Sequence, residues 1–211
     1  MFDALTVRWT IVPQNSPEPW LPCSGCGSVR AFRSSDKIRL NANGRKLDAW
    51  LIYKCVACDK TWNRPIFERR NARSIDSDVI RAMEANDPDW VPGLAFDRDA
   101  LRRHTQRIEG SAEFRVRKNL VREPSDWTRL DIGLAVPLPT DLRLDRLLAS
   151  ELPLARSSLG RMIESGSLRV LSAQGDALRR RIRDGTRVVI DLTVERDRDS
   201  VWRRAAMEEA A

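Results

Sequence analysis

The chain lacks the long apolar segments of a membrane protein. None of its apolar runs approaches the about 20 residues that cross a bilayer as a helix. Residues 1–9 also lack the basic start and apolar core of a secretory signal. We therefore expect no membrane partner and a cytoplasmic location.

The recognisable motifs of catalysis are missing as well. Residues 66–140 contain no nucleophile elbow, P-loop or dinucleotide-binding fingerprint. Asp131, Asp141 and Asp145 are scattered carboxylates, a pattern more typical of surface charges than of an acid–base pair. The single histidine, His104, lies far in sequence from the cysteines. The sequence thus predicts a protein that is not an enzyme.

Cysteine is scarce, and its spacing is informative. The four cysteines form two C-x2-C pairs, Cys23 with Cys26 and Cys55 with Cys58. Two such pairs supply the four sulfurs of a tetrahedral zinc site, and Gly27 allows the tight backbone turn that follows the first pair. Four thiolates fill the coordination shell, so we expect a structural Zn2+ and not a catalytic one. The alternatives are two disulfides or a redox C-x2-C site.

Between the cysteine pairs the pattern predicts a hairpin. Residues 38–42 and 47–53 read as strands, and Asn43-Gly44 between them is a strong turn signal. The order of knuckle, hairpin and knuckle is that of a zinc ribbon, which we place over residues 1–65.

The aromatic side chains of this small module have two roles open to them. A ribbon has little apolar core of its own, so we expect most of its aromatics to pack around the metal site. Aromatic rings beside basic residues also stack on nucleic-acid bases. Trp62, Asn63 and Arg64 are the residues that we expect to be exposed for such contacts.

Four short runs within residues 41–70 share a recognisable pattern. They are Asn41-Ala42-Asn43-Gly44, Leu47-Asp48-Ala49-Trp50-Leu51-Ile52-Tyr53-Lys54-Cys55, Thr61-Trp62-Asn63 and Glu68-Arg69-Arg70. Together they resemble a family of uncharacterised bacterial proteins that carry a zinc ribbon of this layout near the N-terminus. The resemblance implies the zinc site and implies no activity.

The charge favours a polyanionic partner. The net charge is +7 and the pI is about 9.8, which favours nucleic acid. Residues 1–65 hold 10 basic and 5 acidic side chains, residues 141–193 hold 10 and 7, and residues 66–140 hold 13 of each. Arginine outnumbers lysine 32 to 5. This skew suits phosphate recognition, but it follows equally from a GC-rich genome.

The middle of the chain reads as helical and then extended. Residues 74–87 and 97–109 have helical apolar periodicity and capping signals. We therefore expect residues 66–112 to form a helical connector. Residues 114–117 and 130–136 alternate as strands, which we expect to lean on the module that follows.

From Asp141 onward the pattern is two amphipathic helices followed by strands. Three motifs stand out: Arg143-Leu144-Asp145-Arg146-Leu147-Leu148, the run from Ala155 to Val170, and Gly185-Thr186-Arg187-Val188-Val189-Ile190. They resemble the S4 RNA-binding domain, whose motifs are R-L-D-x-x-L, S-R-x-x-A-x-x-L-I-x-x-G-x-V-x-V and G-D-x-V-x-I. The resemblance covers residues 141–193.

The S4 resemblance implies that two short helices present a basic face to structured RNA. The implied RNA contacts are Arg143, Arg146, Arg156 and Arg161, with Arg169 and the cluster Arg179, Arg180 and Arg181 nearby. Guanidinium groups on a rigid face read RNA shape through phosphates and 2′-hydroxyls. The alternative is a solvated helix surface with internal ion pairs, such as Arg143 with Asp145.

These patterns together predict an α+β protein. Its parts are a zinc ribbon over residues 1–65, a helical connector over 66–112, strands plus an S4-like module over 113–193 (core 141–193), and a C-terminal tail over 194–211. The predicted function is non-enzymatic binding of structured RNA, either rRNA or tRNA, with Zn2+ as a structural cofactor. The alternative is a protein-interaction or regulatory module with a protein partner, in which the S4-like region is only a scaffold.

Overall fold

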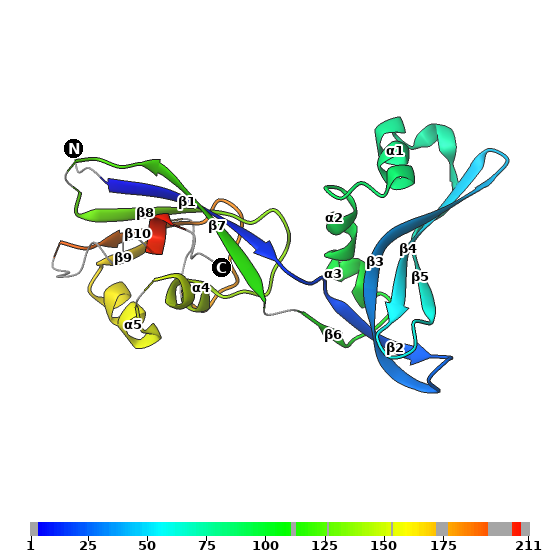
Figure 1. The fold of residues 1–211 in the computed structure, drawn as a ribbon, viewed down its shortest axis with the longest axis horizontal. Coiled ribbons are helices and arrows are strands. Elements are labelled where there is room, and N and C mark those ends of the chain that lie inside the picture. The colour runs from blue at the N-terminus through cyan, green and yellow to red at the C-terminus, as the bar shows by residue number, and fades with distance from the viewer. Residues whose placement is uncertain are drawn as a thin grey trace. The chain divides into compact units, whose positions relative to one another are not determined.

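The chain divides into two compact units, each with its own five-stranded sheet. Unit 1 comprises Met1–Gln14 and Ala112–Ala211, and unit 2 comprises Asn15–Ser111. The computed structural model describes residues 4–110, 113–125, 127–152, 154–171, 177–193 and 204–207. Figure 1 labels the elements of both units.

Unit 2 is an antiparallel sheet with short helices. Its strands are β2 (Glu18–Cys23), β3 (Ser28–Asn43), β4 (Lys46–Cys55), β5 (Thr61–Asn71) and β6 (Ile108–Glu109), in the order β5-β4-β3-β2-β6. Its helices are α1 (Ser77–Ala85), α2 (Val91–Ala95) and α3 (Arg98–Arg102), preceded by a 3-10 turn at Ala72–Ser74. The two-residue strand β6 pairs with β2.

The hairpin predicted over residues 38–53 is confirmed, because β3 and β4 pair on either side of the turn at Gly44. Gly44 adopts a φ of +61° at its turn, a left-handed conformation that glycine accepts without strain. Every second residue of β4 from Leu47 to Cys55 is buried, as expected for a strand with one face on the core. β3 is longer than predicted and begins at Ser28.

The three helices of unit 2 belong to its core. Met83 in α1, Val91 in α2 and Leu101 in α3 are each buried, and α1 and α2 contact β3. The predicted helical connector over residues 66–112 is therefore wrong. Helices as short as α2 and α3 gain stability only by burying an apolar face against a neighbour, and here that neighbour is the sheet. Within the described ranges, no helix is long and apolar enough to cross a membrane.

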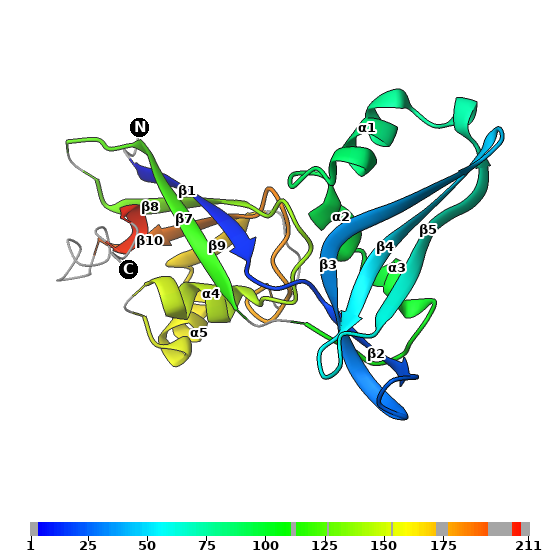
Figure 2. The same cartoon turned by 45° about the vertical axis from the view of Figure 1, so that its right-hand side comes forward.

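Unit 1 is a mixed sheet with two helices on one side, as Figures 1 and 2 show. Its strands are β1 (Ala4–Pro13), β7 (Phe114–Arg122), β8 (Arg129–Ala135), β9 (Leu168–Leu171) and β10 (Arg187–Asp191), in the order β7-β1-β8-β10-β9. The helices α4 (Leu144–Glu151) and α5 (Arg156–Glu164) lie between β8 and β9 in the chain. β1 and β8 are parallel, and the other neighbouring strands are antiparallel.

The core of unit 1 lies between the sheet and its two helices. β1 contributes every second residue from Leu5 to Ile11. Leu147 of α4 and Leu159 of α5 are fully buried in the same cluster. Apolar residues alternate along β1, so one face of the strand is apolar and must be buried. The helices that cover the neighbouring strands also bury this face, which favours a place for β1 inside the sheet.

Trp9 links the sheet to the C-terminal part of the chain. It is fully buried, and its indole N–H donates to the carbonyl of Ala205 at 2.8 Å. Lys118 lies beside it, with its Nζ 2.7 Å from the Glu151 carboxylate and 2.6 Å from the Arg204 carbonyl. Residues 204–206 are thus held against the core, whereas the rest of the predicted tail over 194–211 lies outside the described residues.

The predicted α+β fold class, with zinc ribbon, connector and S4-like module in series, is wrong. The protein is predominantly β and has two sheets. Residues 141–193 contribute two helices and two strands, but β10 pairs with β8, and β8 pairs with the N-terminal strand β1. These elements are therefore part of a larger sheet and not a separate module. Because β10 pairs with β8, the edge of β10 that faces away from β9 is not left exposed.

Replacement of Trp9 by alanine tests this assignment of β1. Trp9→Ala should destabilise unit 1 by about 3–5 kcal/mol, the usual cost of truncating a buried aromatic side chain. The measurement is hydrogen exchange of β8 and β10 amides across a denaturant series. Thr10→Ala, on the opposite face of the same strand, is the matched control and should change stability by less than about 0.5 kcal/mol. Equal effects of the two changes would contradict the assignment.

Candidate functional site

The four cysteines gather where β2 and β4 end. Their Sγ atoms all lie within 4.8 Å of one another, with 3.5 Å between Cys23 and Cys58 and 3.9 Å between Cys26 and Cys55. These separations exclude disulfides, whose sulfurs are about 2.05 Å apart. Four sulfurs held tetrahedrally at about 2.3 Å from a metal are about 3.8 Å from one another. The cluster therefore fits one metal ion bound by four thiolates.

The two C-x2-C pairs adopt the same turn. The N–H of Gly27 donates to the Cys23 carbonyl at 2.9 Å, and the N–H of Asp59 donates to the Cys55 carbonyl at 3.0 Å. Both Gly27 and Asp59 are left-handed, with φ of +65° and +58°. The left-handed turn that the sequence indicated at Gly27 therefore recurs at Asp59, one of the residue types that tolerate this conformation.

Gly25 allows the two turns to approach each other. A Cβ atom at Gly25 would lie 3.0 Å from the Sγ of Cys58 and 3.9 Å from the Sγ of Cys23. Only a residue without a side chain leaves the sulfurs at their present separation. The first turn therefore depends on glycine for the close packing of the cluster as well as for its backbone shape.

The thiols influence one another's protonation. Burial raises the pKa of Cys23, but hydrogen bonds from the Cys26 backbone and the Cys58 thiol outweigh it and lower that pKa to about 7. The backbone of Lys60 lowers the pKa of Cys58, yet hydrogen bonding with the other thiols raises it to about 12. At neutral pH the cluster therefore retains protons, which a metal ion must displace when it binds.

On β5, Arg64 is buried and not exposed as the sequence suggested. Its side chain is 2% exposed, and its Nη2 donates to a backbone carbonyl of α2 at 2.9 Å. The guanidinium lies 5.9 Å from the ring centre of Tyr53, whose pKa is raised by burial to about 12. Trp62 is half-buried, with its ring 5.2 Å from those of Tyr53 and His104. Of the three residues expected at the surface, Asn63 alone is exposed.

In unit 1, two of the predicted RNA contacts face each other at the start of α4. Arg143 and Arg181 form an isolated antiparallel bridge. Arg143 lies 2.8 Å from the Asp145 carboxylate, and Arg181 lies 3.1 Å from that of Asp141. The internal ion pairs that we gave as the alternative therefore do form at these two arginines, although both side chains are about half exposed.

The arginine cluster before β10 lies along the same helix end. The N–H of Leu144 donates to the Arg180 carbonyl at 3.1 Å, which holds the segment 177–183 beside α4. Arg156 and Arg179 line a pocket of about 520 Å³. Arg180 and Arg181 line a second pocket of about 800 Å³, together with Arg183, which no sequence motif had indicated.

The remaining predicted arginines divide between two faces. Arg146 and Arg161 are exposed on α4 and α5, and Arg161 donates to the Ser158 hydroxyl at 3.2 Å. Arg169 is in β9, where Leu168 enters the core and Arg169 lies on the opposite face, away from the helices. Strand alternation was the signal that could have separated Arg169 from the helix arginines.

Seven of the eight predicted arginines lie on α4, at its N-terminal cap, on α5 or in the segment 177–183, and we call these elements together the α4–α5 surface. The seven are Arg143, Arg146, Arg156, Arg161, Arg179, Arg180 and Arg181.

Asp131 has a role that the sequence did not indicate. It is 5% exposed and not a surface charge. Arg187 of the neighbouring strand β10 holds it in a two-point ion pair, with 2.7 Å between Nε and Oδ1 and a second contact from Nη2. The hydrogen bonds from Arg187 to Asp131 raise the pKa of the guanidinium. A carboxylate paired in this way stabilises the sheet and is not available as a general base.

Comparison with known proteins gives a family without an assigned function. Residues 40–174 match the family model described as "Protein of unknown function (DUF1062)". The match spans more than half of the chain, so the chain belongs to the DUF1062 family. It includes Cys55 and Cys58 but not the first cysteine pair. No curated protein and no solved structure matches the chain. Membership of a zinc-ribbon family and of the S4 family, which the sequence motifs suggested, stays a prediction.

The close approach of Gly25 to the sulfurs predicts a specific loss of metal binding. Gly25→Ala should lower metal affinity by about 10- to 100-fold, the range for changes just outside a metal's ligands, because the new methyl group would press on Cys58. Competition with a chromophoric chelator measures this. Gly93→Ala is the matched control, since a Cβ there would meet nothing within 4 Å. Equal affinities for the two variants would contradict the packing argument.

Proposed function

We propose that the chain is a non-enzymatic RNA-binding protein that contacts structured RNA, such as rRNA or tRNA, through unit 1. The observation that supports this best is that seven exposed arginines lie on α4, its N-terminal cap, α5 and the segment 177–183 beside α4. In protein–DNA interfaces, half to two-thirds of the hydrogen bonds go to phosphates and sugars, and duplex RNA is also recognised through its phosphates and 2′-hydroxyls. Guanidinium groups match phosphate oxygens with two parallel hydrogen bonds.

The ion pairs within this surface leave much of its positive charge available. Carboxylates offset Arg143 and Arg181. Arg146 and Arg156 are exposed and, within the described residues, have no carboxylate partner. Arg161 has a neutral hydroxyl as its partner. The uncompensated charge favours a polyanion, and RNA phosphates are the polyanion that the proposal assigns to it.

The shape of the surface also supports an RNA partner. The fully buried Leu147 and Leu159 hold α4 and α5 against the sheet, so the arginines project from rigid elements. The pocket of about 520 Å³ lies between α5 and residues 177–179, and the pocket of about 800 Å³ lies between residues 136–140 and 177–186. A rigid basic surface with hollows suits the recognition of folded RNA by shape and backbone.

We further propose zinc as the metal of unit 2, with a structural role. Soft thiolate ligands in a tetrahedral set favour zinc or iron–sulfur centres over magnesium or calcium. With all four positions taken by Cys23, Cys26, Cys55 and Cys58, no site remains for a reactive water. The bound ion would link the ends of β2 and β4, which stabilises a unit with a small core.

Charge reversal on the α4–α5 surface tests the RNA proposal. Arg156→Glu/Arg179→Glu should weaken binding to a folded tRNA and reduce the slope of log K against log salt by about 2, one for each lost phosphate contact. Fluorescence anisotropy over a salt series measures both. Arg81→Glu/Arg102→Glu, which reverses two exposed helix arginines of unit 2, is the control and should bind like the wild type. Salt-insensitive binding, or equal loss in both variants, would contradict the proposal.

Metal analysis tests the zinc proposal. The purified chain should carry about one zinc per molecule, as a four-thiolate site requires, and Cys26→Ser/Cys58→Ser should carry none. Removal of the metal by a chelator should abolish hydrogen-exchange protection in β2–β4 and leave β1 and β8 protected. A chain that holds iron, or one that keeps full protection in unit 2 after chelation, would contradict a structural zinc.

A further inference from the structure

The sheet of unit 1 has a second face, on which no helix of the described chain packs. α4, α5 and residues 204–206 all contact the apolar face that carries Trp9 and Lys118. The residues that alternate with these point the other way. On β1 they include Thr6, Arg8, Thr10 and Val12, which are exposed or half-buried. Figures 1 and 2 show the helices on one side of this sheet.

Strand register places a series of arginines on this helix-free face. Arg8 of β1 pairs with Asn119 of β7 and with Gly133 of β8, and Gly133 in turn pairs with Arg187 of β10. Arg8 and Arg187 therefore flank a glycine, with no side chain between them.

Three further arginines extend the series to both edges of the sheet. Arg117 of β7 pairs with Thr10, and Arg115 pairs with Val12. Arg169 of β9 pairs with Val189. We call Arg8, Arg115, Arg117, Arg169 and Arg187 the sheet-face arginines. Five strands at a spacing of about 4.8 Å make this face about 20 Å wide.

Two of the carboxylates on this face are paired with arginines. Asp131 is held by Arg187, and Asp191 lies 3.9 Å from Arg129. Among the described residues, no carboxylate pairs with Arg8, Arg115 or Arg117. The β7–β1 side of the face therefore has a strong uncompensated positive charge, and the outward alternation of β7 keeps it exposed.

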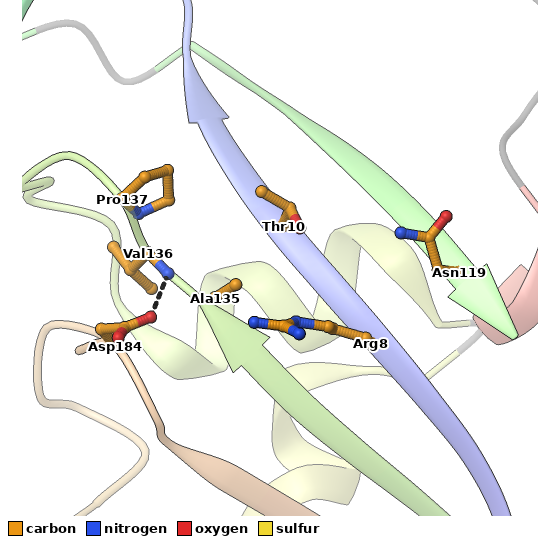
Figure 3. Close-up of a pocket in the computed structure, with 7 residues that line it drawn as sticks. All are labelled: Arg8, Thr10, Asn119, Ala135, Val136, Pro137 and Asp184. Atoms are coloured by element: carbon orange, nitrogen blue, oxygen red, sulfur yellow. Dashed lines mark hydrogen bonds between the residues drawn. The ribbon is translucent and has the colours of Figure 1, made fainter. Parts of the chain in front are cut away.

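A polar pocket lies on this side of the face. Figure 3 shows Arg8 and Thr10 of β1 between Asn119 of β7 and Ala135 of β8. The pocket has a volume of about 530 Å³. Its one carboxylate, Asp184, accepts a hydrogen bond from the N–H of Val136 at 2.9 Å. A guanidinium, a hydroxyl and an amide are the groups that proteins use to bind phosphate oxygens.

The side chains on this face indicate which form of nucleic acid it suits. At the described outward positions of the five strands there is no aromatic residue. Proteins that bind single strands rely on aromatic rings for base stacking. Double-helical RNA hides its bases and is recognised through phosphates and 2′-hydroxyls. An array of arginines without aromatics therefore matches the duplex form.

We propose that the helix-free face of unit 1 is a second RNA-binding surface, which binds the phosphate backbone of double-helical RNA through Arg8, Arg115 and Arg117. The choice of RNA as the occupant rests on the proposed function, whereas the surface itself is separate from the α4–α5 surface. A folded RNA that contacts both surfaces would be bound by unit 1 on two faces.

The test measures binding of the full chain to an RNA duplex of about 16 base pairs, the length that one double-stranded-RNA-binding domain spans. Arg8→Glu/Arg117→Glu should weaken binding by at least about 10-fold and reduce the salt slope by about 2. Arg8→Gln/Arg117→Gln, which removes the charges and adds none, should act in the same direction. Near-UV circular dichroism of the seven tryptophans, among them the buried Trp9, checks that the variants are folded.

Comparison variants make the outcomes distinguishable. Arg81→Glu/Arg102→Glu should bind like the wild type, and an equal loss in this control would overturn the inference. If Arg156→Glu/Arg179→Glu loses binding while Arg8→Glu/Arg117→Glu does not, the second surface is overturned and the proposed function stands. If the wild type binds no RNA at low salt, both fail. Tighter binding of a single strand of the same length would overturn the duplex as the occupant.

Discussion

The apolar alternation of β1 is the constraint on which unit 1 depends. It turns Trp9 and its neighbours toward α4 and α5, and it inserts the strand between β7 and β8. The same alternation puts Arg8 and Thr10 on the opposite face. One strand therefore fixes the core that supports the α4–α5 surface and begins the array of sheet-face arginines. The two-residue periodicity of β1 thus separates the core residues of the strand from Arg8 on the helix-free face.

Unit 2 is stabilised differently, because its sheet is long and its helices are short. β3 and β4 carry much of the sheet, and α2 and α3 have only five residues each. The four cysteines lie where a metal ion would fasten β2 to β4. Gly25, Gly27 and Asp59 shape the two turns that bring the sulfurs within reach. A metal bound here, as proposed, would therefore stabilise the unit itself and would not be an addition to a finished fold.

Turn and cysteine-spacing patterns in the sequence were reliable, whereas helix lengths and long-range pairing were not. The helix predicted over residues 97–109 ends at Arg102, and Ile108–Glu109 form strand β6. Turn chemistry predicted the β3–β4 hairpin, and C-x2-C spacing predicted the cysteine cluster, because both depend on neighbouring residues. Nothing local indicates that β1 pairs with β8, more than a hundred residues later. The connector predicted over residues 66–112 failed because helical periodicity does not say what a helix packs against. Arg64 and Asp131 were misjudged for a related reason: a charged side chain is buried when a partner from another element meets it.

The central claim, that unit 1 is the RNA-binding part of the chain, is tested most directly by crosslinking in cells. Ultraviolet crosslinking followed by mass spectrometry identifies which peptides carry an RNA adduct. The account predicts adducts on peptides of unit 1, foremost those that contain Arg156 or the segment 177–183, and on a structured RNA. Adducts confined to the peptides of unit 2, or none above background, would contradict it.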